Sequence, residues 1–447
     1  MFSRRSLLQF SAGTALSQGR GIDLSDLPNF CSHEHWGSIA SIGSTPEGYR
    51  ADVERGALPT RRTGILDLLV DPYSRGFYAR AGSDLEKLDF SKRQVSSPWD
   101  TFQTLQPILG RQRYTGTFQT TRRGILQLYG VDISRLDKQS FQALDDAIAL
   151  KYANHFDWYR DAMNRSRFSG LIRPVHPEFY VRQSNPEAGA RETAFTKTVL
   201  RIDPFVTLWN LESPRRKSLS AIASIEPVDA RSWRHFLDKM FELAAAGGAL
   251  GIKQLQAYRR PLEFGVHEDS AVRWVGNLDA DQQRIFEDWV VHECCKRAND
   301  RGWPHQVHVG TNNIEQSSPM GLYRLGQRYP QMKIVMIHCW PFLKEAGWIA
   351  KFLPNAYIDS CWLPILNPEF FREAISIWWN YVPLHKITCG QDATTVEMAA
   401  GSSLFHREIL GEVLTAKSKE FGMSETEIRE AAQSMLNDNA IGLYGLR

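Results

Sequence analysis

Two histidines near the beginning of the chain are separated by one residue, in the segment Cys31-Ser32-His33-Glu34-His35. Side chains alternate in direction along a β-strand, so a strand over 30–35 would point His33 and His35 to one side and Glu34 to the other. Neutral imidazole binds Zn²⁺, Mn²⁺ and related ions well, and two imidazoles supply half of a tetrahedral shell. A single His-x-His pair is a weak signal, because such pairs also line cores and polar loops.

Three later segments strengthen the metal interpretation, because each is an apolar, strand-like run that ends at a metal-binding residue type. They contain His308, His338 and Asp392. In a parallel barrel the carboxyl ends of all strands lie on one rim, so residues far apart in sequence meet there. The sequence therefore predicts that these three side chains join His33 and His35 at one rim.

The elements that would position these residues alternate between strand-like and helical patterns. Strand-like runs lie at 170–175, 203–209 and 249–256, a helix candidate covers 280–298, and a closing helix covers 425–443. Alternation of this kind predicts a parallel sheet with covering helices. Because its strand ends gather candidate ligands, we expect an α/β fold of the closed (β/α)8 TIM-barrel type.

The region after the first predicted strand lacks runs typical of buried strands. Between about 38 and 168 it contains turn-rich stretches and helical patterns such as 141–150. We therefore expect one barrel domain over 20–447 with a largely helical insertion. Aromatic and basic residues of the insertion are candidates for a lid, although packing and solvated charge are their commoner roles. These residues are Tyr114, Arg122, Arg123, Tyr129 and Trp158.

The five candidate ligands, taken together, resemble the metal-site pattern of the amidohydrolase superfamily. Further motifs resemble its amidohydrolase-related subfamily, and most closely the hydrolase-like half of the nodulin and glutamine-synthetase fusion proteins. These motifs are Ile252-Lys253-Gln254, Ala257-Tyr258-Arg259, Pro304–Gly310, His338–Phe342, Glu345-Ala346-Gly347, Pro354–Asp359 and Gly390–Ala393. The segment 306–313 and the helical insertion are also similar to uronate isomerases.

The resemblance implies a catalytic metal site with an open position. His33, His35, His308 and Asp392 would hold one divalent ion, Zn²⁺ in the first place or Mn²⁺, which lowers the pKa of water and polarises a carbonyl. Asp392 would also accept the proton of the attacking water, and His338 would hydrogen-bond the reacting oxygen.

The family resemblance also makes the number of metal ions depend on the chemical state of Lys253. As a carboxylated lysine it would bridge two metals, and as a free cation it would pair with Asp392 or with a substrate carboxylate. We favour one ion, because a second ion needs more ligands than the sequence offers.

Four residues near the predicted rim are candidate substrate contacts: Arg173, Tyr258, Arg259 and Trp340. Tyr258 and Arg259 match a motif of the family, and Arg259 can clamp a carboxylate through two parallel hydrogen bonds. Arginines at strand ends also pair with local acids, which is the plainer interpretation.

The resemblance implies a metal-dependent hydrolase that uses metal-activated hydroxide to cleave a carbon–nitrogen bond in a small, carboxylate-bearing substrate. A uronate-type isomerase, a decarboxylase and an inactive metal- or ligand-binding protein stay open as alternatives. Two residues depart from the family: Cys31 stands where many members have an acid, and Gln391 where many have Ser. Both changes alter the surroundings of the ligands, not the ligand set.

Charge and composition limit the kinds of partner that the protein is expected to bind. The 53 Lys and Arg residues nearly balance the 50 Asp and Glu residues, and no long basic run is present, which argues against a nucleic-acid partner. The six cysteines contain no Cys-x-x-Cys motif and predict buried thiols, not a disulfide framework. A homo-oligomer is compatible with the sequence.

The first residues predict an export signal. Within 1–19, Arg4-Arg5 precedes a short, weakly apolar segment, as is typical of twin-arginine signals. The segment is too short to span a membrane. We expect a periplasmic or exported protein, and the alternative is the basic tail of a cytoplasmic enzyme.

Overall fold

The computed structural model describes residues 21–36, 62–80, 82, 97–181 and 195–446. Eight parallel strands form one sheet in the order β1 to β8. They are β1 (Asn29–Cys31), β2 (Phe168–Val175), β3 (Thr196–Arg201), β4 (Ala249–Gln254), β5 (Pro304–Val309), β6 (Lys333–His338), β7 (Ala356–Asp359) and β8 (Ile387–Thr388). The predicted TIM-barrel fold is confirmed, and the predicted twin-arginine segment lies outside the described residues.

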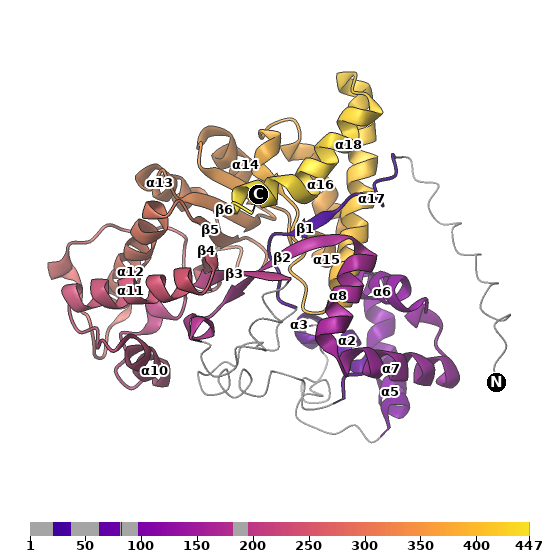
Figure 1. The fold of residues 1–447 in the computed structure, drawn as a ribbon, viewed down its shortest axis with the longest axis horizontal. Helices are drawn as coiled ribbons and strands as arrows, with labels where there is room; N and C mark the ends of the chain where they lie inside the picture. Colours follow the sequence, from indigo (N-terminus) through magenta and orange to yellow (C-terminus); the bar gives the residue numbers. More distant parts are fainter. Residues whose placement is uncertain (1–20, 37–61, 81, 83–96, 182–194, 447) are drawn as a thin grey trace.

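Helices follow the strands and cover the outer face of the sheet (Figure 1). They are α10 (Pro214–Ala223), α11 (Ala230–Ala246), α12 (Ala280–Asp300), α13 (Met320–Arg328), α14 (Leu343–Phe352), α15 (Leu363–Leu366), α16 (Pro368–Trp378), α17 (Val396–Phe421), α18 (Glu425–Gln433) and α19 (Asn439–Leu443). The predicted helix over 280–298 is α12. The predicted closing helix is α18 and α19, joined by a π-helical turn at Ser434–Asp438.

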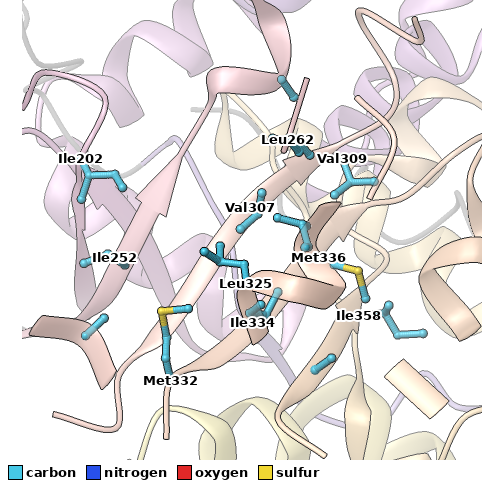
Figure 2. Packing of buried hydrophobic residues seen from close by; sticks show 14 of the residues in the cluster. Ile202, Ile252, Leu262, Val307, Val309, Leu325, Met332, Ile334, Met336 and Ile358 are labelled. Atoms are coloured by element: carbon cyan, nitrogen blue, oxygen red, sulfur yellow. The ribbon is translucent and has the colours of Figure 1, made fainter. Parts of the chain in front are cut away.

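Both faces of the strands are buried, which is why they read as continuous apolar runs. On β6, Val335 and Ile337 pack inside the barrel, whereas Ile334 and Met336 pack between the sheet and the helices. Figure 2 shows part of this outer layer, where Met336 lies near Ile358 of β7. A rigid frame therefore supports the carboxyl ends of the strands.

The barrel closes where the first and last strands meet. The Asp392 amide donates to the carbonyl of His33 (2.9 Å), and the amides of His35 and Trp36 donate to the carbonyl of Ala393 (3.2 and 3.1 Å). These bonds lie beyond the short strands β1 and β8, so the closure is made by the segments that carry the candidate ligands.

The described part of the region between β1 and β2 is helical, as predicted. It contains α2 (Ile65–Leu69), α3 (Pro72–Arg80), α5 (Pro98–Gln112), α6 (Gly116–Tyr129), α7 (Lys138–Tyr152) and α8 (His155–Ser166). Helix α6 crosses α17 at two glycines. A Cβ on Gly124 would lie 1.7 Å from the carbonyl oxygen of Glu397, and one on Gly401 would lie 1.8 Å from that of Thr120. Only glycine allows this close approach, which holds the insertion against the barrel.

Two predicted strands differ from the structure. The first strand ends at Cys31, so His33 and His35 lie in the segment after it. The run 203–209 is not a strand: Phe205–Thr207 is a 3-10 turn, because Pro204 lacks the N–H that a central strand must donate. The third strand is β3, just before it.

The prediction of buried thiols without disulfides is confirmed, because all six cysteines are free and buried. Within the described ranges, no helix combines the length and apolar character needed to cross a membrane.

Candidate metal centre

Three candidate ligands from the two ends of the sheet converge on one point. The Nε2 atoms of His33 and His35 lie 3.7 and 3.1 Å from Oδ1 of Asp392, and ligand atoms of the three residues all lie within 4.8 Å of one another. His33 and Asp392 are buried, whereas the side chain of His35 is 31% exposed. The structure therefore brings together a His, His, Asp set with access to solvent.

His338 and His308 extend this set one after the other in space. Nε2 of His338 lies 3.3 Å from Oδ2 of Asp392, and it also lies 3.1 Å from Nδ1 of His308. His308 in turn has Nε2 3.1 Å from Oγ1 of Thr311. His338 thus contacts the carboxylate directly, whereas His308 contacts the cluster through His338.

Hydrogen bonds on the far side of two rings fix their tautomers. Nδ1 of His33 lies 2.8 Å from Oε1 of Gln306, whose amide nitrogen donates to the carbonyl of Ser32 and to the hydroxyl of Tyr444. Nδ1 of His338 lies 2.9 Å from the carbonyl of Cys361. Since both partners are acceptors, each Nδ1 carries the proton and each Nε2 presents a lone pair to Asp392.

The charge states leave His33 and His338 unable to donate a hydrogen bond to Asp392. Burial lowers the pKa of His33 well below its usual range and lowers that of His338 to about 4, so both rings are neutral at pH 7. Burial raises the pKa of Asp392, but the nearby His33 and His35, with a hydrogen bond from His35, outweigh burial and lower the pKa to well below its usual range. The Nε2 atoms of His33 and His338 therefore carry no proton that they could donate to the ionised carboxylate. A divalent cation among these atoms would satisfy all of them, so the residues fit the metal that the sequence predicts.

Strained backbone gathers at the same rim. Thr311, His338, Cys339, Trp362 and Asp392 have φ values between 55° and 72°. This left-handed region costs a non-glycine residue about 1–2 kcal/mol. All five residues lie at or just beyond the carboxyl ends of β5 to β8. Strain of this kind is typical of sites whose side chains are aimed by the surrounding fold.

A cavity of about 390 Å³ opens over the cluster. Its wall includes three cationic side chains from neighbouring strands, namely Arg173 of β2, Arg201 of β3 and Lys253 of β4. Lys253 is fully buried and its Nζ has no hydrogen-bond partner within the described residues. Burial lowers the pKa of Lys253 to about 8, which leaves the amine mostly protonated at pH 7. The cavity is therefore suited to an anionic molecule.

The candidate substrate contacts separate into two groups. Arg173 and Tyr258 line the cavity, and the ring of Tyr258 packs 4.5 Å from that of His308. Arg259 follows a 3-10 turn and is exposed, and it is not among the residues that line the cavity. Trp340 stacks on Phe370, with ring centroids 4.0 Å apart, and also lies away from the cavity wall.

Sequence reasoning missed four polar residues of the cavity wall: Tyr73, His176, Arg201 and Thr394. Tyr73 comes from α3 of the insertion, and its hydroxyl donates to Oδ1 of Asp392 (2.8 Å). Arg201 was missed because the third strand was placed at 203–209. The alternating run Thr196–Arg201 was the signal that could have found it.

The five proposed lid residues do not line this cavity. Arg122 pairs with Asp132, and Arg123 pairs with Glu408. Tyr129 and Trp158 donate to the buried carboxylate of Glu397, while Tyr114 is 79% exposed. These residues pack the insertion or lie on the surface.

Comparison with known proteins shows which family the second half of the chain resembles. Residues 242–446 match the family model described as amidohydrolase. The resemblance to the amidohydrolases is confirmed. Protein fluG of Emericella nidulans is 25% identical over 304 residues, which cover 63% of this chain but only 30% of fluG. The chain therefore spans less than a third of the length of that curated relative.

Solved structures share the barrel fold over nearly the whole chain. The uronate isomerase of Thermotoga maritima (13% identity, TM-score 0.70) covers 94% of this chain and 95% of its own. The glucuronate isomerase of Caulobacter crescentus (15%, TM-score 0.71) covers 94% and 92%. A candidate metal-dependent hydrolase of Lactobacillus casei (16%, TM-score 0.61) covers 95% and 98%. At these identities the likeness establishes the fold alone.

Proposed function

We propose that this protein is a metal-dependent hydrolase that cleaves a carbon–nitrogen bond in a small substrate bearing a carboxylate. The observation that carries the proposal is the set of acceptor atoms, unprotonated Nε2 of His33 and His338 around ionised Asp392, at the base of a cationic cavity. Acceptors arranged in this way suit a divalent cation, and the cations of the wall suit an anion.

His33, His35 and Asp392 would hold a single ion, Zn²⁺ or Mn²⁺. When bound, the ion would lower the pKa of a water molecule and polarise a carbonyl oxygen. We assign His308 a place beside the ligands, because its Nδ1 meets Nε2 of His338.

Asp392 is the group that moves the proton. Its Oδ1 accepts from Tyr73 and lies nearest to His33 and His35, whereas Oδ2 faces His338. Oδ2 would accept the proton of the attacking water and return it to the leaving nitrogen. The Tyr73 hydroxyl holds the carboxylate in the orientation that this transfer requires.

Lys253, Arg173 and Arg201 would bind the substrate carboxylate. The amine of Lys253 is desolvated and unpartnered by the described residues, so an incoming carboxylate would gain a strong, charge-assisted bond. Among amides, a glutamyl amide has such a carboxylate, which makes this class the first to assay.

A sugar-acid isomerase is the second candidate, and one observation favours it. The hydroxyl of Tyr73 and the carboxylate of Asp392 form a donor and acceptor pair at the cavity wall. Transfer of a proton between adjacent carbons can use such a pair as general acid and general base. The likeness of 306–313 to the uronate isomerase strand agrees with this candidate.

The deciding experiment combines metal analysis with two assays. We expect the purified protein to bind about one equivalent of metal and to hydrolyse glutamyl amides, and we expect chelation to abolish turnover until Zn²⁺ or Mn²⁺ is restored. Conversion of uronates without amide hydrolysis would establish the isomerase instead. Failure to bind either metal after refolding would overturn both and favour a protein without catalysis.

Lys253→Met tests the carboxylate assignment. We expect its KM for an acidic amide to rise about 10- to 100-fold, as for loss of a buried charged hydrogen bond. Lys386→Met is the matched control, because Lys386 is also buried but donates to the carbonyls of Ala350 and Leu353, away from the cavity. An unchanged KM in the Lys253 variant would contradict the assignment.

A further inference from the structure

The peptide segment that carries Asp392 is fastened to the segment that carries the histidines in an unusual way. Three successive amides take part. The amide of Gln391 donates to Sγ of Cys31 (3.2 Å), that of Asp392 to the carbonyl of His33 (2.9 Å), and that of Ala393 to Oε1 of Glu34. Two of the three acceptors are side chains, where a β-ladder would use only carbonyls.

These two side chains also bond to each other. Cys31 and Glu34 are fully buried, and Sγ of Cys31 donates to Oε2 of Glu34 (3.1 Å). Oε1 of Glu34 accepts a second backbone bond, from the amide of His35 (2.9 Å). The carboxylate thus links the amide of His35 to the amide that follows Asp392.

The geometry at Asp392 makes this fastening necessary. Asp392 has φ of 55°, a conformation that is unfavourable for a residue with a side chain. The amides on both sides of it are held by Cys31 and Glu34, and its own amide is held by His33. The direction of the Asp392 carboxylate therefore depends on acceptors supplied by the first strand and the residues after it.

We infer that Glu34 and Cys31 are a positioning pair that fixes the left-handed backbone at Asp392 and so sets its carboxylate between His33, His35 and His338. Neither residue lines the cavity, so neither acts on substrate. Only the consequence for metal binding rests on the proposed function.

The experiment is hydrogen–deuterium exchange of the metal-free protein, resolved for peptides that cover 389–395. Glu34→Ala should speed exchange there about tenfold or more, since local opening then exposes amides that have lost their acceptors. Glu34→Gln should restore most of the protection, because its amide oxygen can still accept from His35 and Ala393.

Glu397→Ala is the matched control. Glu397 is equally buried, but accepts from Tyr129, Tyr152 and Trp158 of the insertion. It should speed exchange in the insertion helices and leave 389–395 protected. Unchanged exchange of 389–395 in Glu34→Ala, or an equal rise in both variants, would overturn the inference.

Cys31→Ala keeps the test decisive if Glu34→Ala does not fold. It removes the acceptor of the Gln391 amide and the thiol that donates to Glu34, but leaves Glu34 in place to accept from Ala393. Faster exchange at 389–391 therefore supports the inference, and wild-type exchange contradicts it. Metal affinity, measured by chelator competition, should fall about tenfold in Glu34→Ala and not in Glu397→Ala. A wild-type protein that binds no metal would sink the proposed function, whereas the exchange result would still decide the role of the pair.

Discussion

Two buried carboxylates lie five residues apart and have opposite surroundings. Asp392 and Glu397 are 3% and 0% exposed. Glu397 accepts from the hydroxyls of Tyr129 and Tyr152 (both 2.8 Å) and from the indole N–H of Trp158 (3.2 Å). Asp392 accepts from Tyr73 alone among the described hydroxyls and otherwise faces histidine nitrogens.

The comparison shows that burial and an acidic side chain are not enough to identify a catalytic carboxylate. Glu397 is saturated by donors that the insertion supplies, so its role is to hold the insertion on the barrel. Asp392 instead faces two histidine nitrogens that are themselves acceptors, Nε2 of His33 and Nε2 of His338. The distinguishing property is the kind of atom that surrounds the carboxylate, which can be tested at both positions.

The largest effect is expected from Asp392→Asn. Loss of the ligand and proton acceptor should lower kcat about 10²- to 10⁴-fold and weaken metal binding. Steady-state assays and chelator competition measure the two effects. Turnover equal to wild type would show that Asp392 is as structural as Glu397.

Glu397→Ala should have the reverse pattern. Three buried donors lose their acceptor, so we expect a loss of about 3 kcal/mol in the free energy of unfolding, measured with urea. The kcat of the remaining folded protein should equal that of wild type. A fall in kcat as large as that of Asp392→Asn would remove the distinction between the two carboxylates.

The parts of the site that lie at the ends of strands could be predicted from the sequence. The barrel, and the meeting of His33, His35, His338 and Asp392 at one rim, follow from apolar runs that stop at ligand-type residues. Alternation along a strand does not explain why His33 and His35 converge, because β1 ends at Cys31. The two histidines are positioned by hydrogen bonds that the chain makes after the strand.

What the sequence could not give are contacts between the insertion and the rim. Tyr73 and Tyr129 both lie in helices of the insertion, yet one bonds to Asp392 and the other to Glu397. No local pattern distinguishes them, because the partner of each tyrosine depends on how α3 and α6 dock on the barrel. Arg259 illustrates the same limit: its motif placed it in the site, but the 3-10 turn before it leaves its side chain exposed.

A smaller effect should separate two tyrosines that donate to these carboxylates over the same distance, 2.8 Å. Tyr73→Phe removes a bond to Asp392, and we expect kcat to fall about tenfold with little change in stability. Tyr152→Phe removes a bond to Glu397 and should cost about 1–2 kcal/mol of stability with kcat unchanged. Equal effects of both substitutions on kcat would contradict the assignment of Tyr73.

The smallest effect is a difference in how stability depends on pH. Burial raises the pKa of Glu397 above its ordinary 4.5, so the native state holds this proton more tightly than the unfolded state. Its contribution to stability is therefore present below pH 4.5 and is lost as the pH rises through the native pKa. The pKa of Asp392 lies below its ordinary 3.8, so its contribution is present above pH 3.8 and is lost as the pH falls.

Urea unfolding with chelator present, from about pH 3.5 to 7, tests this difference. Relative to wild type, the free energy of unfolding of Glu397→Gln should increase as the pH rises, and that of Asp392→Asn should increase as the pH falls. Parallel curves for the two variants would mean that the two carboxylates are alike.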